Sequence, residues 1–330
     1  MEYRMFGQTD ITVSVLGFGC WEMGGTYGDI GESQVSAAVN RAIDLGINCF
    51  DTAPAYGRGQ SERTLGKALG PRRKDVVVVT KCGVGYEDRP KGRDSRMVSI
   101  MASVEQSLRD LQTDYLDVLL IHWPDVTTPF EETMHALDNI VQQGKARAVG
   151  VSNFTLDQIK ECTAAQRIDA VQYGLNMFDR RMEQEMFPYF QEQGIGVMVY
   201  GPLAFGLLTG AFTEATTFGQ NDWRATGGRP GWNVGVFAEE HFQRNVRVVE
   251  QLKPIAERRG KKMPHLALRW VLSNPAVSVA LVGTRTVEEL EDNMAVMEWA
   301  LSGNDMAEID EVFARFAVDT HPDIEIDPEQ

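Results

Sequence analysis

Three mostly apolar segments of the chain each end in a side chain that can carry a proton or a charge. Asp51, Lys81 and His122 occupy these positions, and Tyr56 lies five residues after the aspartate, beyond a turn that contains proline. The preceding segments are residues 47–50, 76–80 and 116–121. If they are neighbouring parallel strands, their carboxyl ends meet at the same edge. We therefore expect the four side chains to form one site.

These residue types together suit the transfer of a proton to a carbonyl oxygen. A phenol such as Tyr56 has a pKa of about 10 and is a weak acid at neutral pH, but an adjacent ammonium from Lys81 favours the phenolate and lowers that pKa. Asp51 would keep the lysine charged, and His122 could hydrogen-bond an oxygen on which negative charge develops. No protein nucleophile is evident, so a hydride from a nicotinamide would complete the reaction.

Each of these residues has an ordinary structural explanation when it is considered alone. An aspartate at a strand end commonly caps a turn or a helix, and a histidine between Ile121 and Trp123 is commonly buried in a core. Lys81 is less easily explained, because burying an ammonium is costly unless it is paired, and Asp51 is the natural partner. Four such residues at one edge favour a functional site.

The spacing of the strand ends predicts the architecture. Polar residues follow strands at 51, 81, 122, 152, 172 and 200, and a strand–helix unit needs about 30 residues. Strands at 13–19 and 277–282 bring the total to eight. Sustained alternation of strands and helices indicates a parallel sheet. The sequence therefore predicts an α/β fold, and specifically a (β/α)8 TIM barrel. An N-terminal β-hairpin is expected within residues 4–16. The expected helices are 32–45, 61–69, 95–111, 130–141, 156–165, 180–193, 241–259, 265–272, 287–299 and 306–316.

We expect residues 1–330 to form a single domain. A doubly wound sheet with a second domain is the alternative, but no linker divides the chain, and the polar residues follow most strands instead of one switch point. The interval from 200 to 282 carries an insertion after strand seven, with a long loop at 205–236 as a candidate lid and then extra helices. The last helix, 306–316, is also additional, and residues 321–330 form an acidic tail.

Composition and charge narrow the classes of partner. The net charge of −15 disfavours nucleic acid and anionic membranes, and no apolar run approaches the roughly 20 residues of a membrane span. The N-terminus lacks the apolar stretch of a secretory signal. None of the four cysteines forms a Cys-x-x-Cys or a zinc-spaced cluster. We expect a cytoplasmic monomer or homo-oligomer with free thiols and no metal.

Glycine-rich segments give weaker signals. Gly17 to Glu22 begins like a dinucleotide fingerprint, but Glu22 stands where the last glycine should be. Two other glycine-containing segments, 201–206 and 283–285, follow strands seven and eight, where barrels commonly bind phosphate.

At these positions the chain resembles the aldo-keto reductase superfamily, over nearly its whole length and most closely in its bacterial branch. The resemblance implies a (β/α)8 barrel that binds extended NADP(H) and reduces aldehydes or ketones, including sugars or other hydroxy-carbonyl compounds, to alcohols. The matching motifs are Phe50-Asp51-Thr52-Ala53 with Tyr56-Gly57, Thr80-Lys81, Ile121-His122, Gly150-Val151-Ser152-Asn153-Phe154, Gln172, Tyr200-Gly201-Pro202-Leu203 with Gly206-Leu207-Leu208-Thr209-Gly210, and 283–293.

The resemblance also assigns roles to individual residues. Tyr56 would be the general acid, Lys81 would lower its pKa, Asp51 would pair with Lys81, and His122 would orient the carbonyl. The substrate pocket would be lined by Trp21, Tyr56, Tyr86, His122 and Trp123.

For the cofactor, the resemblance places the nicotinamide carboxamide on Ser152, Asn153 and Gln172 and stacks its ring on Tyr200. Glu289 stands where relatives often have Gln or Arg, so NADPH would be preferred over NADH by a reduced margin. The other expected contacts are Gly19, Cys20, Trp21, Asp51, Gly201, Pro202, Leu203, Gly206, Leu208, Gly283, Thr284, Arg285, Glu289 and Asn293.

Two other functions are compatible with the same residues. One is a redox-sensing, non-catalytic subunit of a channel, a role of some relatives; His122 argues against it, because such subunits tend to carry Asn there. The other is a Schiff-base lyase with Lys81 as the nucleophile, which a neighbouring Asp51 would oppose by keeping the lysine charged.

Overall fold

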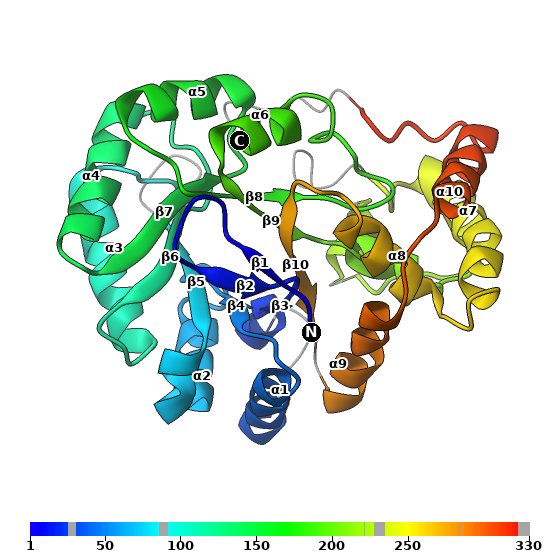
Figure 1. Ribbon diagram of the computed structural model, residues 1–330, viewed down its shortest axis with the longest axis horizontal. Helices are drawn as coiled ribbons and strands as arrows, with labels where there is room; N and C mark the ends of the chain where they lie inside the picture. The colour runs from blue at the N-terminus through cyan, green and yellow to red at the C-terminus, as the bar shows by residue number, and fades with distance from the viewer. Residues whose placement is uncertain (26–30, 86–91, 221, 228–234, 285, 323–330) are drawn as a thin grey trace.

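The computed structural model describes residues 1–25, 31–85, 92–220, 222–227, 235–284 and 286–322. Eight parallel strands form a closed barrel in the order β10-β3-β4-β5-β6-β7-β8-β9, which confirms the predicted (β/α)8 fold (Figure 1). The strands are β3 (Leu16–Gly19), β4 (Cys49–Asp51), β5 (Val77–Cys82), β6 (Leu116–Ile121), β7 (Ala146–Ser152), β8 (Ala170–Gly174), β9 (Gly196–Tyr200) and β10 (Val277–Gly283).

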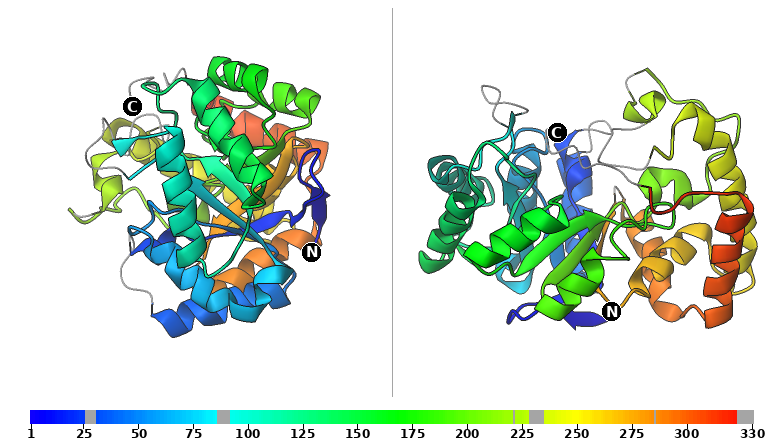
Figure 2. Two further views of the ribbon diagram at one scale, coloured as in Figure 1. Left: turned by 90° about the vertical axis from the view of Figure 1, so that its left-hand side faces the viewer. Right: turned by 90° about the horizontal axis from the view of Figure 1, so that it is seen from above.

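Helices surround the barrel and cover the outward faces of its strands (Figure 1). Their buried sides pack against strand residues in one large apolar cluster. The additional helices α7 and α10 lie side by side at one flank (Figures 1 and 2). The helices are α1 (Glu32–Asp44), α2 (Gln60–Leu69), α3 (Met97–Asp110), α4 (Phe130–Gln142), α5 (Leu156–Ala165), α6 (Met186–Gln193), α7 (Glu239–Glu257), α8 (Met263–Leu272), α9 (Val287–Asn293) and α10 (Gly303–Arg315).

The predicted N-terminal hairpin consists of β1 (Tyr3–Met5) and β2 (Thr12–Ser14), paired antiparallel. It lies across the amino ends of the barrel strands, at the lower edge of the right-hand view in Figure 2, and the Gln8 main-chain N–H donates to the Gly194 carbonyl at 2.9 Å. Its side chains Phe6 and Ile11 join the second apolar cluster, which consists largely of strand residues. One end of the barrel is therefore closed by apolar packing.

Several predicted boundaries differ from those observed. The first barrel strand begins at Leu16 instead of Val13, because residues 12–14 pair with β1. Helix α6 begins at Met186 instead of Arg180, since residues 181–185 form turns. The helix expected at 287–299 is divided into α9 and the 3-10 helix η6 (Met294–Glu298). None of the helices in the described part of the chain is both long and apolar enough to cross a membrane.

The segment expected as a long loop after strand seven contains two 3-10 helices, η4 (Ala204–Thr209) and η5 (Trp223–Thr226). It is held by edge-on aromatic contacts, including Phe205 with Trp223 and Phe212 with Phe218, both at 5.4 Å between ring centroids. The Arg224 guanidinium lies 4.8 Å from the centre of the Phe218 ring. The described part of this insertion therefore has an aromatic core of its own.

Candidate active site

The strand register brings the predicted catalytic residues to the open, carboxyl end of the barrel. Asp51 is the last residue of β4, Lys81 is the fifth of the six residues of β5, and His122 directly follows β6. These three strands are consecutive neighbours, with Asp51 paired to Val79 and Lys81 paired to Leu120. The expectation that the side chains share one edge is met.

Lys81 is fully buried, and its ammonium lies at the centre of the site. Its Nζ atom is 2.7 and 2.8 Å from the two carboxylate oxygens of Asp51 and 2.9 Å from the Thr52 carbonyl. It also donates to the Tyr56 hydroxyl oxygen at 3.2 Å. Because the phenol oxygen accepts this bond, its own hydrogen is directed elsewhere. Tyr56 can thus donate a proton while Lys81 stays in contact with the oxygen left behind.

The pKa of Tyr56 differs in direction from the sequence-based expectation. Burial raises it well above its ordinary value, and the carboxylate of Asp51 raises it further. The ammonium of Lys81 is shared with Asp51, and it does not outweigh the desolvation of the phenolate. The net pKa is therefore raised, opposite to the direction expected from Lys81 alone, and the phenol is protonated at neutral pH.

His122 is neutral in this environment. Burial is the largest cause that lowers the pKa of its imidazole well below the usual range, followed by the positive charges of Lys81 and Arg93. Its ring meets the Tyr56 ring edge-on, with centroids 5.8 Å apart. A neutral imidazole has one N–H donor and one acceptor nitrogen, so His122 can donate a hydrogen bond to an oxygen that Tyr56 also faces.

The residues predicted to hold a nicotinamide are hydrogen-bonded to one another. The Ser152 hydroxyl donates to the Gln172 carbonyl at 2.8 Å, and the Asn153 side-chain nitrogen lies 3.0 Å from the Ser152 oxygen. The Tyr200 hydroxyl donates to Asn153 Oδ1 at 2.9 Å, which fixes the orientation of its ring. Asn153 has a φ of 64°, a left-handed conformation that asparagine tolerates better than most residues.

The segment predicted to follow the pyrophosphate has an irregular backbone. Gly201 has a φ of 63° and Gly206 a φ of 103°, values that favour glycine over residues with a Cβ atom. Leu203 is half-buried, whereas the side chains of Pro202 and Leu208 are buried, so the last two can offer only main-chain atoms to a ligand.

The other expected cofactor contacts lie around the ends of β3 and β10. Gly19 ends β3, and Trp21 opens the half-buried 3-10 turn η1 (Trp21–Gly24). The thiol of Cys20 is fully buried, so this residue too can contribute only through its main chain. Gly283 ends β10 and Thr284 follows it.

Near the start of α9, the Glu289 main-chain N–H is bonded to the Thr286 hydroxyl, which caps the helix, and Asn293 is the last residue of α9. Tyr86 and Arg285 were also predicted to line the site, but they lie outside the described residues.

Two side chains near the site were not singled out as ligands by the sequence. A Cβ atom on Gly283 would lie only 1.9 Å from a carboxylate oxygen of Glu22, so this carboxylate packs directly against the end of β10. Arg224 reaches the Phe205 carbonyl at 3.4 Å, above the irregular segment that contains Gly206. The placement of Glu22 could have been suspected from the sequence, because a glutamate is unusual in a glycine-rich segment. The placement of Arg224 could not, because it depends on the tertiary packing of the insertion.

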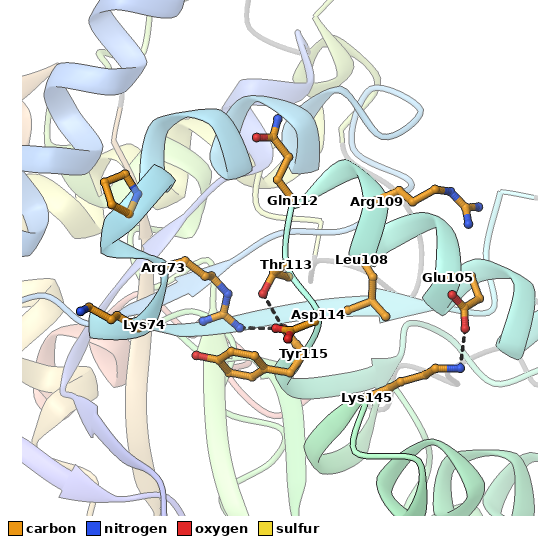
Figure 3. A pocket seen from close by; sticks show the side chains of 11 residues that line it. Arg73, Lys74, Glu105, Leu108, Arg109, Gln112, Thr113, Asp114, Tyr115 and Lys145 are labelled. Carbon is orange, nitrogen blue, oxygen red and sulfur yellow. Dashed lines mark hydrogen bonds and ion pairs between the residues drawn. The ribbon is translucent and has the colours of Figure 1, made fainter.

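A cavity of about 760 Å³ lies away from this site, at the amino end of the barrel (Figure 3). It is lined by Arg73, Lys74, Leu108, Tyr115 and Lys145, among others. In Figure 3 the guanidinium of Arg73 donates to the Tyr115 carbonyl, and Lys145 pairs with Glu105. These contacts hold the loops that precede β5, β6 and β7.

Comparisons with a family profile, with individual proteins and with solved structures all indicate the same family. The sequence profile of the Aldo/keto reductase family matches residues 15–314. The "Aldo-keto reductase YhdN" of Bacillus subtilis (strain 168) is 37% identical over 94% of this chain and 93% of its own, and the "NADH-specific methylglyoxal reductase" of Escherichia coli (strain K12) is 35% identical over 91% and 94%. The solved structure of glycerol dehydrogenase AKR11B4 from Gluconobacter oxydans superposes with a TM-score of 0.87 at 33% identity, covering 96% of each chain.

Proposed function

This chain belongs to the aldo/keto reductase family, and on that basis we propose that it reduces aldehydes or ketones to alcohols with NADPH as the hydride donor. The observation that carries the proposal is the contact of a buried, carboxylate-paired Lys81 ammonium with the Tyr56 hydroxyl at 3.2 Å. This arrangement supplies a proton donor whose conjugate base is stabilised in place. The substrate would be a small carbonyl compound, including sugars and other hydroxy-carbonyls.

Each residue of the site has a definite part in this reaction. A reduced nicotinamide supplies the hydride. Tyr56 gives its proton to the carbonyl oxygen, and the Lys81 ammonium stabilises the phenolate that remains. Asp51 holds the ammonium through both carboxylate oxygens, and His122, kept neutral by burial and nearby positive charge, donates a hydrogen bond to the same oxygen.

The donor set beside the catalytic residues fits a nicotinamide. Ser152 at the end of β7, Asn153 after it and Gln172 within β8 have hydroxyl and amide groups, which match the donors and acceptors of a carboxamide. Tyr200 at the end of β9 offers a ring held in position by Asn153. The glycine backbone after β9 would allow close approach of a pyrophosphate.

The choice between NADPH and NADH depends on the adenosine end. The 2′-phosphate of NADPH adds about two negative charges, which a guanidinium at position 285 could bind through forked hydrogen bonds. A carboxylate at Glu289 would instead suit the free 2′-hydroxyl of NADH, and one relative is named as NADH-specific. We therefore propose a modest preference for NADPH.

This preference is tested by measuring Kd for both cofactors in two variants. Arg285→Ala should weaken NADPH binding about ten- to hundredfold and NADH binding much less, and Glu289→Gln should widen the preference for NADPH. An equal loss for both cofactors in Arg285→Ala would show that this arginine does not contact the phosphate.

The alternative of a Schiff-base lyase is disfavoured by the surroundings of Lys81. Its ammonium lies within hydrogen-bond distance of both Asp51 oxygens, the Thr52 carbonyl and the Tyr56 hydroxyl, so its three N–H groups are all engaged. A nucleophilic lysine must lose its charge, and a bidentate carboxylate opposes that. Borohydride trapping of a substrate on Lys81 would revive this alternative.

The deciding experiment is a panel of aldehydes, ketones and sugars, scored by the loss of NADPH absorbance. Turnover that depends on Tyr56 would support the proposed reaction. Tight NADPH binding with very slow turnover of every carbonyl would favour the non-catalytic, redox-sensing subunit instead.

We further propose that the protein acts in the cytoplasm as a monomer or homo-oligomer, without nucleic acid or membrane partners.

A further inference from the structure

Gln172 joins opposite walls of the barrel at the active site. Its side-chain nitrogen lies 2.7 Å from Asp51 Oδ1, and the residue is 2% exposed. Gln172 is on β8 and Asp51 on β4, which are four strands apart in the closed order of eight. The hydrogen bond therefore crosses the interior of the barrel and ends on the carboxylate that holds Lys81.

The chemistry of the two groups fixes the direction of this hydrogen bond. An ionised carboxylate can only accept, so the atom of Gln172 that faces Asp51 is the amide nitrogen. Asp51 Oδ1 thus accepts hydrogen bonds from both Gln172 and Lys81, at 2.7 Å each. Of these two donors, Lys81 is the one that also bonds Oδ2. A donor on the neighbouring strand β5 and a donor on the distant strand β8 together determine where the carboxylate lies, and hence where the ammonium meets Tyr56.

The same glutamine is connected to the rest of the site through its main chain. Ser152 donates to the Gln172 carbonyl, and Asn153 bonds the Ser152 oxygen and, at 3.1 Å, the His122 carbonyl. A continuous set of hydrogen bonds therefore runs from Asp51 to the main chain of His122. It passes through the residues that the proposed function assigns to the nicotinamide carboxamide.

We propose that Gln172 is a positioning residue that acts on the Lys81–Tyr56 pair through Asp51, so that ordering of the nicotinamide site also orders the proton donor. An amide has two N–H groups and one oxygen, which gives Gln172 the capacity to bond Asp51 and a carboxamide at the same time. The inference rests on the proposed function and adds to it a role for Gln172 in the chemical step.

The first test separates cofactor binding from chemistry in Gln172→Met, which keeps the length of the side chain and removes its hydrogen-bonding groups. Losing a hydrogen bond to a charged group should lower kcat about ten- to hundredfold. Loss of one neutral contact should raise the directly titrated Kd for NADPH only about two- to tenfold. An increase in Kd with an unchanged kcat would overturn the proposal.

A double-mutant cycle tests whether the effect passes through Asp51. In an Asp51→Asn background, Gln172→Met should lower kcat by less than about threefold, because the positioned carboxylate is already gone. Ser152→Ala, which removes a neighbouring group with no bond to Asp51, should be additive with Asp51→Asn. Additive losses for Gln172→Met would show that it acts independently of Asp51 and would overturn the proposal.

A readout without substrate or cofactor separates this inference from the proposed function. In protein labelled with ¹³C at tyrosine Cζ, the Tyr56 resonance, assigned with Tyr56→Phe, should move in Gln172→Met as Lys81 shifts. The matched control is Tyr173→Phe on the same strand, which removes a buried hydrogen bond to the Phe154 carbonyl on the helix-facing side. That control should leave the Tyr56 resonance and kcat unchanged and lower the melting temperature.

These experiments distinguish a failure of the proposed function from a failure of the positioning role. A moved Tyr56 resonance in a protein that reduces no carbonyl would refute the proposed function and support the positioning role. An unmoved resonance in an active reductase would refute the positioning role and leave the function standing.

Discussion

The two ends of the barrel each hold a buried carboxylate paired with a cation. At the carboxyl end Asp51 binds Lys81. At the amino end Asp117, the second residue of β6, binds Arg73 at 2.9 Å and Arg147 at 2.8 Å, and it also accepts from the Val78 main-chain N–H at 2.9 Å. Both aspartates are buried, so burial and charge alone do not distinguish them.

The difference lies in what else the cation contacts. The Arg73 guanidinium donates to the carbonyls of Val76 and Tyr115, groups that carry no transferable proton, and thereby fixes the loops shown in Figure 3. Lys81 instead donates to the hydroxyl of Tyr56, which does carry one. Of these two ion pairs, the one at the carboxyl end suits proton transfer, because its cation donates to a hydroxyl that has a proton to give.

The strongest test of this contrast is Tyr56→Phe, which removes the transferable proton and keeps the ring. We expect kcat for carbonyl reduction to fall by about 10²- to 10⁴-fold, because Tyr56 is the acid that the Lys81 ammonium contacts. The Kd for NADPH and the melting temperature should change little. Activity within tenfold of the unmodified protein would rule out Tyr56 as the proton donor.

At the amino end the opposite outcome is expected. Asp117→Asn removes the charge between two arginines and should lower the free energy of unfolding by about 3 kcal/mol, the low end for breaking a buried pair, since Arg147 is partly exposed. Urea unfolding measures this loss, and kcat at 20 °C should stay within twofold. A lower kcat with unchanged stability would contradict a purely structural role for this end.

If Asp117→Asn does not fold, the milder Arg147→Met gives the same test. It removes one of the two arginine partners of Asp117, together with a contact to the exposed Asp10, and should cost about 1 kcal/mol without affecting kcat.

The last prediction concerns the charge state of His122 in the folded protein. Its pKa is lowered in the folded protein, whereas in the unfolded chain it takes up a proton near its ordinary pKa of 6.5. Below that pH the unfolded state binds more protons, so stability falls as pH falls. His122→Asn should flatten this dependence between pH 6.5 and 5 by at most about 1 kcal/mol per pH unit.

Urea unfolding across that pH range measures the effect. Identical slopes for the two proteins would show that His122 protonates normally in the folded state, and its role as a neutral donor would then fail.

The sequence by itself determined the barrel and the meeting of Asp51, Tyr56, Lys81 and His122 at one end of it. Runs such as 116–121 are apolar throughout except for Asp117, as strands buried on both faces must be, and Asp51, Lys81 and His122 each follow their run directly along the chain. These signals are local, so the expected bounds of β6 and α5 agree with the structure. Helix α6 was predicted too long because its apolar pattern continues through turns that Arg181 stabilises by pairing with Asp179.

Only the tertiary structure decided the relations between residues that are distant along the chain. The hydrogen bond between Gln172 and Asp51 joins positions 121 residues apart, and neither residue's neighbours in sequence indicate it. The direction of the Tyr56 pKa likewise depends on how much water the folded barrel excludes around the phenol and on where Asp51 lies. Desolvation and charge–charge interactions are set by distances in space, and those distances exist only once the barrel has closed.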